Sequence, residues 1–358
     1  MAPAFVKPDD DGVRPPLAVA SHGVLPLDVL FDVLLRLPAD ELCRLRLVCR
    51  SWRSLTSDPL FAKVHSSRHP HIIAIDRHNR RQVHVLDLSG SIVRRIRLDQ
   101  LGDSPSIPSD LLCVSLFWGQ AYTRNLVTGM VVGDMAAERS VASVLGLGHI
   151  PSTGEYKVLR IQSEPWETCQ VRTLGSSSNG GWRQRPWPPV IISESSMKMA
   201  LVGGVAYFLV DQVEIGPDSI ASFDLATEEW RPTTIQGPLS NIFASTGDKL
   251  KYRIRSRDLS LAKLNDSLVM VNYNRQDGSR DLWFLDDMDK PLWTKRYSVQ
   301  CEDVLLCNYH PLAVLDDEKI VFLVNKDLRS YDPRTSTWAY LATVRSYIAV
   351  RVHHGSLL

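Results

Sequence analysis

The sequence of 358 residues has almost no net charge and no long apolar run. Its 41 Lys and Arg residues against 40 Asp and Glu residues give a formal charge of +1, which argues against nucleic acid as a partner. No window reaches the roughly 18 apolar residues of a membrane-spanning helix, so no membrane partner is expected. The first residues, MAPAFVKPDDDGVRPP, lack the basic start and apolar run of a secretory signal, and residues 1–22 are predicted to be a disordered tail.

The sequence also lacks any pair of cysteines spaced as CxxC. That absence argues against a disulfide framework and favours reduced thiols, in the cytoplasm or the nucleus. His65, His69 and His71 lie close together, but no cysteine or carboxylate accompanies them at ligand spacing, so no metal site is predicted. The six cysteines are scattered through the chain: Cys43, Cys49, Cys113, Cys169, Cys301 and Cys307.

Catalytic motifs are lacking as well. GDSP at 102–105 resembles a serine-hydrolase tetrapeptide, yet no apolar strand leads into it. Gly146 and Gly148 precede no helical pattern and therefore form no phosphate loop. We expect no catalytic residues and no cofactor, and a protein that is not an enzyme.

The densest apolar run, LPLDVLFDVLLRLPADELCRLRLVCRSW at 25–52, predicts amphipathic helices. A first apolar face repeats at helical spacing between Pro26 and Pro38, and a second runs from Leu42 to Leu55. Asp58 followed by Pro59 is a helix start signal for a third, short helix. Residues 23–66 are thus predicted to form a small domain of about three helices, either a cap on the larger domain or a docking module with an exposed apolar face.

From residue 70 onward the pattern alternates with period two, which predicts an all-β domain over 70–350. A short motif of an aspartate followed by a tryptophan recurs as FDLATEEW at 223–230, LDDMDKPLW at 285–293 and YDPRTSTW at 331–338. Hairpins precede these copies, with tight turns predicted at Gly203-Gly204 and Asn265-Asp266 and a further hairpin over 312–324. Weaker copies at 85–90 and 124–129 keep a spacing of about 40 residues, typical of a β-propeller, here of about six blades.

Each part of that motif has an expected structural role. The aspartate is expected to accept hydrogen bonds from the backbone of a tight turn, and the tryptophan to pack between blades. The fold class is therefore a small helical domain followed by an all-β propeller.

The helical segment resembles an F-box over residues 24–65, nearly position for position, from Leu25-Pro26 to Phe61 and His65. The resemblance implies that this domain binds a Skp-type adaptor and, through it, a cullin. Some of the implied contact residues, such as Leu45, Val48 and Trp52, are shared with the core of the domain. The implied adaptor-binding residues are Leu25, Pro26, Leu30, Leu34, Leu37, Pro38, Leu42, Leu45, Val48 and Trp52.

The β region is similar to the F-box-associated, kelch-like β-propeller of plant F-box proteins, through RNLVTG, LGHIPSTGEYKVLRI, VRTLGSSSNGGWR and SIASFDLATEEWR. The two resemblances together imply the non-catalytic substrate-recognition subunit of an SCF-type ubiquitin ligase, whose propeller binds the protein to be ubiquitinated before proteasomal degradation. Two alternatives remain: an F-box protein that acts outside degradation, for example as a regulatory cofactor, and a glycan-binding propeller.

One further stretch, KLKYRIRSR at 249–257, places five basic residues at period two. On a strand they would share one face. The face is either a solvated edge that discourages aggregation or a platform for an acidic or phosphorylated substrate, with Lys251, Arg253 and Arg255 as its contacts.

Overall fold

The structure is a computed structural model of the whole chain. It describes residues 26–79, 82–97, 111–115, 120–125, 131–136, 143–163, 167–174, 181–193, 195, 198–212, 214–216, 218–239, 258–288, 290–301 and 309–353. The predicted tail, residues 1–22, lies outside these ranges. No helix in the described ranges is long and apolar enough to cross a membrane.

The N-terminal part is a small helical domain with its own core. Its helices are α1 (Leu27–Leu34), α2 (Ala39–Leu45), α3 (Arg50–Thr56) and α4 (Pro59–Arg68). The core consists of fully or almost fully buried side chains from three of these helices and the α1–α2 linker: Leu30, Leu34, Leu35, Leu42 and Phe61.

The described part of this domain has four helices, so the expectation of about three was wrong. The apolar face from Leu42 to Leu55 is not one helix, because the backbone of Cys49 is extended at φ −155° and ψ 167°. Cys49 instead caps α3, since its Sγ accepts a hydrogen bond from the backbone N–H of Trp52 at 3.5 Å. The Asp58-Pro59 start signal is confirmed, and the Asp58 carboxylate accepts from the N–H of Leu60 at 2.7 Å.

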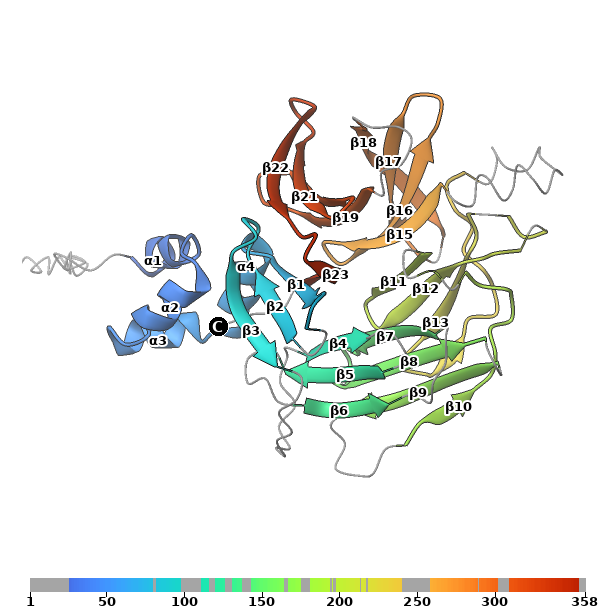
Figure 1. Ribbon diagram of the computed structural model, residues 1–358, viewed down its shortest axis with the longest axis horizontal. Helices are drawn as coiled ribbons and strands as arrows, with labels where there is room; N and C mark the ends of the chain where they lie inside the picture. The colour runs from blue at the N-terminus through green and yellow to red at the C-terminus, as the bar shows by residue number, and fades with distance from the viewer. Residues whose placement is uncertain are drawn as a thin grey trace, which may run out of the picture.

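The rest of the described chain consists mainly of β-strands, which form antiparallel sheets arranged in a ring (Figure 1). One sheet contains β1 (His71–Asp76), β2 (Gln82–Leu86), β3 (Ile92–Arg97) and β23 (Tyr347–His353). A second contains β4 (Leu111–Ser115), β5 (Gln120–Asn125) and β6 (Val131–Ala136). A third contains β7 (Ser143–His149), β8 (Tyr156–Gln162), β9 (Thr168–Leu174) and β10 (Arg183–Arg185).

Three more sheets follow in chain order. They contain β11 (Met199–Val202), β12 (Val205–Leu209), β13 (Ile220–Asp224) and β14 (Glu229–Trp230); β15 (Leu259–Leu264), β16 (Ser267–Asn274), β17 (Ser279–Asp287) and β18 (Leu292–Gln300); and β19 (Tyr309–Val314), β20 (Ile320–Val324), β21 (Asp327–Asp332) and β22 (Thr337–Thr343). The described residues therefore form five four-stranded blades, whereas about six blades were expected. The β4–β6 sheet has three strands.

The ring is closed by strands from its two ends. β23 pairs antiparallel with β1, and this places a strand from residues 347–353 at the inner edge of the first blade. The inner strands β4, β7, β11, β15, β19 and β23 are neighbours in that order around the centre, as Figure 1 shows. Apolar clusters fill the spaces at four boundaries between adjacent blades, so the three blades from β11 to β22 each contribute to two of these cores.

The predicted hairpin turns are confirmed. Gly203 and Gly204 have φ of 58° and 82°, and Asn265 and Asp266 have φ of 46° and 61°. These left-handed conformations are those that a two-residue hairpin turn requires, which explains the Gly and Asn/Asp residues at these positions.

The expected roles of the repeat motif are also confirmed. Asp224 accepts from the backbone N–H of Ala226 at 2.8 Å, and Asp332 from that of Arg334 at 2.9 Å. The three repeat tryptophans donate their indole N–H to a carbonyl oxygen of the preceding blade or of the segment that follows it: Trp230 to Pro186 at 3.0 Å, Trp293 to Gln236 at 2.8 Å and Trp338 to Gln300 at 2.9 Å. The motif thus joins each of these three blades to the blade before it.

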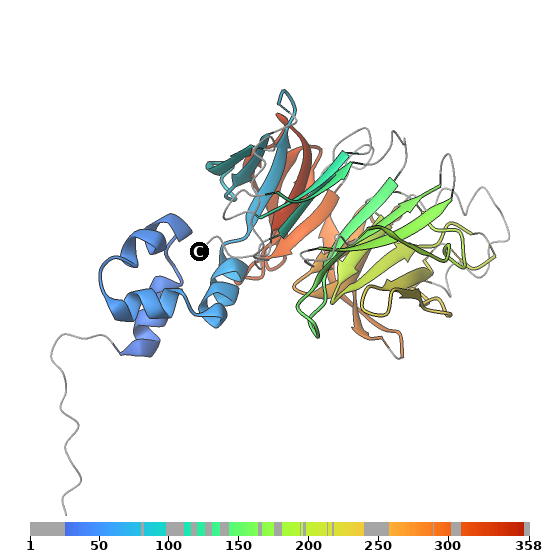
Figure 2. The same cartoon turned by 90° about the horizontal axis from the view of Figure 1, so that it is seen from below.

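The helical domain joins the propeller through α4, which is followed at once by β1 (Figure 2). At the propeller end of α4, Arg68 forms an ion pair of 2.8 Å with Asp316, in the β19–β20 turn. Near the same end of α4, His65 and His69 donate from Nε2 to the carbonyl oxygens of Leu37 and Leu35, at 2.8 and 3.0 Å. α4 is therefore bonded both to the end of α1 and to a blade.

Candidate functional site

The helical domain keeps a set of large apolar side chains exposed although it has a complete core. On α1, Val29 and Val33 point away from the buried Leu30 and Leu34 and are 41% and 45% exposed. The full set in this domain is Leu27, Val29, Val33, Leu47, Val48 and Leu60. This number of exposed apolar side chains makes the small domain a candidate protein-binding surface.

The structure places the predicted adaptor-binding residues in different environments. Leu30, Leu34 and Leu42 are buried in the helical core, where their side chains support the outer surface rather than forming it. Leu37, Leu45 and Trp52 are partly buried against the same core. Leu25 lies outside the described residues, whereas the exposed members of the predicted set are Pro26, Pro38 and Val48.

Sequence reasoning missed most of the exposed apolar residues, namely Leu27, Val29, Val33, Leu47 and Leu60. The signal was present, because Val29 and Val33 are four residues apart and share a face of α1 next to the face of Leu30 and Leu34. The basic stretch 249–257, with Lys251, Arg253 and Arg255, lies outside the described residues, so its two interpretations stay predictions.

The histidines near the domain junction have structural environments. Burial lowers the pKa of His65, opposed by its bond to the Leu37 carbonyl, and burial together with the two nearby histidines lowers the pKa of His71 to about 4. A neutral ring at physiological pH suits the bond that His65 donates. Within the described ranges, no three His, Cys, Asp or Glu side chains are grouped to hold a metal ion.

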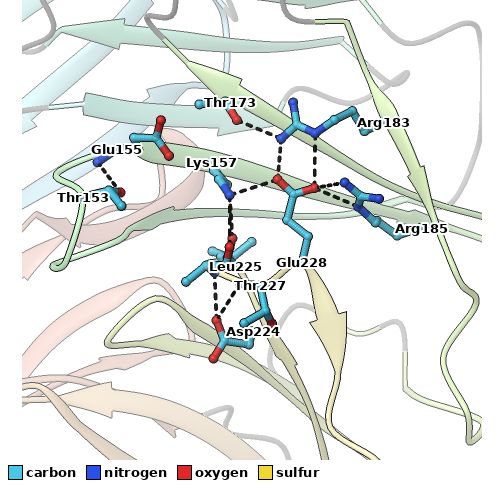
Figure 3. A network of polar contacts seen from close by, with 11 residues as sticks. Thr153, Glu155, Lys157, Thr173, Arg183, Arg185, Asp224, Leu225, Thr227 and Glu228 are labelled. Atoms are coloured by element: carbon cyan, nitrogen blue, oxygen red, sulfur yellow. Dashed lines mark hydrogen bonds and ion pairs between the residues drawn. The ribbon is translucent and has the colours of Figure 1, made fainter.

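A second polar site lies between two blades and consists of Lys157, Arg183, Arg185 and Glu228 (Figure 3). We refer to these four residues as the inter-blade clamp. Lys157 lies on β8 and the two arginines on β10, whereas Glu228 lies in the β13–β14 turn of the next blade. The Glu228 carboxylate accepts from Lys157 Nζ at 2.9 Å, from Arg183 Nε at 3.2 Å and from Arg185 Nε at 2.7 Å.

Register explains how residues from distant segments meet. Lys157 pairs with Thr173 across β8 and β9, and the side chains of Lys157, Arg183 and Arg185 share the face of their sheet that packs against the β11–β14 blade. Lys157 also donates to the carbonyl oxygen of Leu225 at 2.9 Å, and Arg183 donates to the Thr173 hydroxyl at 2.8 Å. Every buried group of the clamp is therefore hydrogen-bonded across the blade boundary or within its own sheet.

Glu228 is unusual in both backbone and charge. Its φ of 59° is left-handed, a conformation that costs a non-glycine residue about 1 kcal/mol or more. Burial opposes ionisation of this carboxyl, but hydrogen bonds from Arg183, Lys157 and Arg185 outweigh it and lower its pKa to about 2. The carboxylate thus stays charged and holds three cations in fixed positions. No local sequence pattern indicates this site, because its four residues lie on three separate segments.

Comparison with known proteins agrees with both halves of this architecture. The family described as "F-box-like" matches residues 22–67, and the family described as "F-box associated beta propeller domain" matches residues 113–331. Among curated relatives from Arabidopsis thaliana, F-box protein At3g07870 is 28% identical, over 77% of this chain and 72% of the relative. F-box/LRR-repeat protein At2g43260 is 24% identical, over 86% of this chain and 76% of the relative. The chain therefore belongs to the F-box associated β-propeller family and carries an F-box-like domain at its N-terminus.

Proposed function

We propose that this protein is the substrate-recognition subunit of an SCF-type ubiquitin ligase. The F-box domain binds a Skp-type adaptor and, through it, a cullin, while the propeller holds the protein to be ubiquitinated. The observation that carries the proposal is the exposed apolar set on the helical domain, within the match to the F-box-like family.

The energetic argument for an adaptor is direct. Leu47 is 80% exposed and Val48 is 62% exposed, although a core lies next to them. Burying one such side chain in an interface contributes about 1.5–3 kcal/mol. Several of them together provide the apolar centre of a stable protein–protein interface. Pro26, Pro38 and Val48 remain our predicted contacts, joined by the exposed residues of α1.

The propeller then acts by position rather than by chemistry. Bringing a bound protein close to a ubiquitin-conjugating enzyme raises the effective concentration of its lysines, and no catalytic group of this chain is needed. The bonds from α4 to Leu35, Leu37 and Asp316 favour a fixed distance between the two domains.

The experiment is a pull-down of a Skp-type adaptor by the full chain carrying Val33→Asp or Leu47→Asp. Each change places a charge in the proposed interface, and we expect affinity to fall at least about tenfold. The matched control is Ile191→Asp, because Ile191 is 63% exposed but lies on the propeller. Equal binding by all three variants would contradict the proposed interface.

A second measurement separates degradation from other roles. If the protein acts in a ubiquitin ligase, a cullin co-purifies with the wild type and is lost in the Val33→Asp variant. Adaptor binding without any cullin would favour a role outside degradation.

A further inference from the structure

We propose that Arg183 and Arg185 of the inter-blade clamp are the docking point for an anionic side chain, a carboxylate or a phosphate, of the protein held by the propeller. This inference rests on the proposed function, for which it names the chemistry of the substrate.

The first observation is an imbalance of charge. Lys157, Arg183 and Arg185 share the single carboxylate of Glu228, which leaves two positive charges in the clamp. Glu155 acts on Arg183 through space and offsets one of them. By contrast, Arg334 and Arg275 each pair with one carboxylate of their own, Glu318 and Asp258.

The second observation is how the excess charge is distributed. The side chains of Lys157 and Glu228 are each only 9% exposed, whereas those of Arg183 and Arg185 are 37% and 32% exposed. The buried members thus stabilise the contact between the blades, and the surplus positive charge lies on the two arginines that solvent reaches.

The third observation is which edge of each guanidinium is in use. Both arginines contact Glu228 through Nε and Nη2, and Arg183 Nη2 also donates to Thr173. Among the described residues, Nη1 of neither arginine has an acceptor. Since a guanidinium carries five N–H donors, the outward edges remain free for an oxyanion.

The buried carboxylate also fixes both arginines in place before any partner arrives. An arginine that is already held loses less side-chain entropy on binding, so more of each new hydrogen bond contributes to affinity. Arg183 and Arg185 lie two residues apart on β10, the outermost strand of its blade, and therefore face the same side at the rim of the propeller.

The test uses the full chain and two labelled probes, a hexaglutamate peptide and a peptide with one phosphoserine among neutral residues. Fluorescence anisotropy measures their binding at low and at physiological salt. We expect Arg185→Gln to weaken the preferred probe about tenfold, the loss of one charge-assisted contact. The preferred probe identifies the anion as carboxylate or phosphate.

The matched control is Arg296→Gln. Arg296 also lies on an outer strand, β18, but is paired with its own carboxylate, Asp286, so binding should change less than about twofold.

Two results would overturn the proposal: no binding of either probe by the wild type, or equal effects of Arg185→Gln and Arg296→Gln. The adaptor pull-down is run in parallel on the same proteins. A wild type that binds the adaptor but neither probe rejects the docking point alone, whereas a wild type that binds a probe but not the adaptor rejects the ligase function alone.

Discussion

The indole N–H of Trp338 donates to the carbonyl oxygen of Gln300 at 2.9 Å and so joins β22 to the end of β18 in the preceding blade. The same ring packs against Tyr309, Phe322 and Tyr331, with centroids 5.0–5.5 Å apart. One side chain thus combines a directional bond between blades with a large buried contact.

Replacing Trp338 separates these two contributions. Trp338→Phe keeps an aromatic ring but removes the donor, and should lower the free energy of unfolding by about 1–2 kcal/mol. Trp338→Ala also removes the packing and should cost about 3–5 kcal/mol. Urea unfolding, followed by the far-ultraviolet circular dichroism of the backbone, measures the stability loss in each variant. Equal losses in the two variants would mean that the hydrogen bond, and not the ring contact, dominates.

Glu228 should make the propeller sensitive to acid. Its pKa of about 2 lies below the ordinary value of 4.5, so its contribution to stability is present above pH 4.5 and is lost as the pH falls towards 2. The difference in unfolding free energy between wild type and Glu228→Gln should therefore be about 3 kcal/mol at pH 7 and shrink below pH 4.5. Urea titrations at pH 7, 4 and 3 test this. A difference that does not depend on pH would contradict the assigned charge state.

Asp58 should stabilise the helical domain but not the propeller. Asp58→Ala removes the acceptor for the Leu60 N–H at the start of α4 and should destabilise that domain by about 1 kcal/mol. Hydrogen exchange of amides in α1–α4 is expected to speed up, while amides in β11–β13 stay protected. Asp58→Asn, which keeps a capping oxygen, serves as the control and should behave like the wild type.

The propeller should fold without the helices but not without its last strand. A fragment of residues 70–358 keeps both β1 and β23, and its circular dichroism should be β-rich with cooperative unfolding. A fragment of residues 70–346 lacks β23, exposes the inner edge of β1, and should aggregate or unfold non-cooperatively. Similar stability of the two fragments would show that ring closure contributes little.

How far the sequence predicted this structure depended on the distance between interacting residues. The Asp-to-Trp motif and the turn at Gly203-Gly204 are local patterns, and both were predicted correctly because local backbone geometry dictates the residue types. The break before Cys49 was missed, since the apolar spacing from Leu42 to Leu55 fits a single helical face and the extended backbone of one residue leaves no periodic trace.

The clamp and the ring closure escaped prediction for a different reason. Glu228 meets Lys157 and Arg183 only because two blades pack with a particular register, and neither segment alone specifies that register. The two charged residues Arg183 and Arg185 are as compatible with an ordinary solvent-exposed outer strand as with a shared ion-pair site. The exposed set on α1 was detectable in principle, but apolar residues on both sides of a short helix do not reveal which side the core covers.

The pairing of β1 with β23 also sets an order of events during synthesis. The helical domain has a local core and is complete once residue 68 has left the ribosome, whereas the propeller ring closes only when β23 emerges. At about 5–20 residues per second, the helices are available for roughly 15–60 s before the ring is closed. Under the proposed function, a messenger RNA truncated before the β23 codons yields a protein that binds the adaptor but holds no substrate. Such a product would compete with the intact receptor for the adaptor.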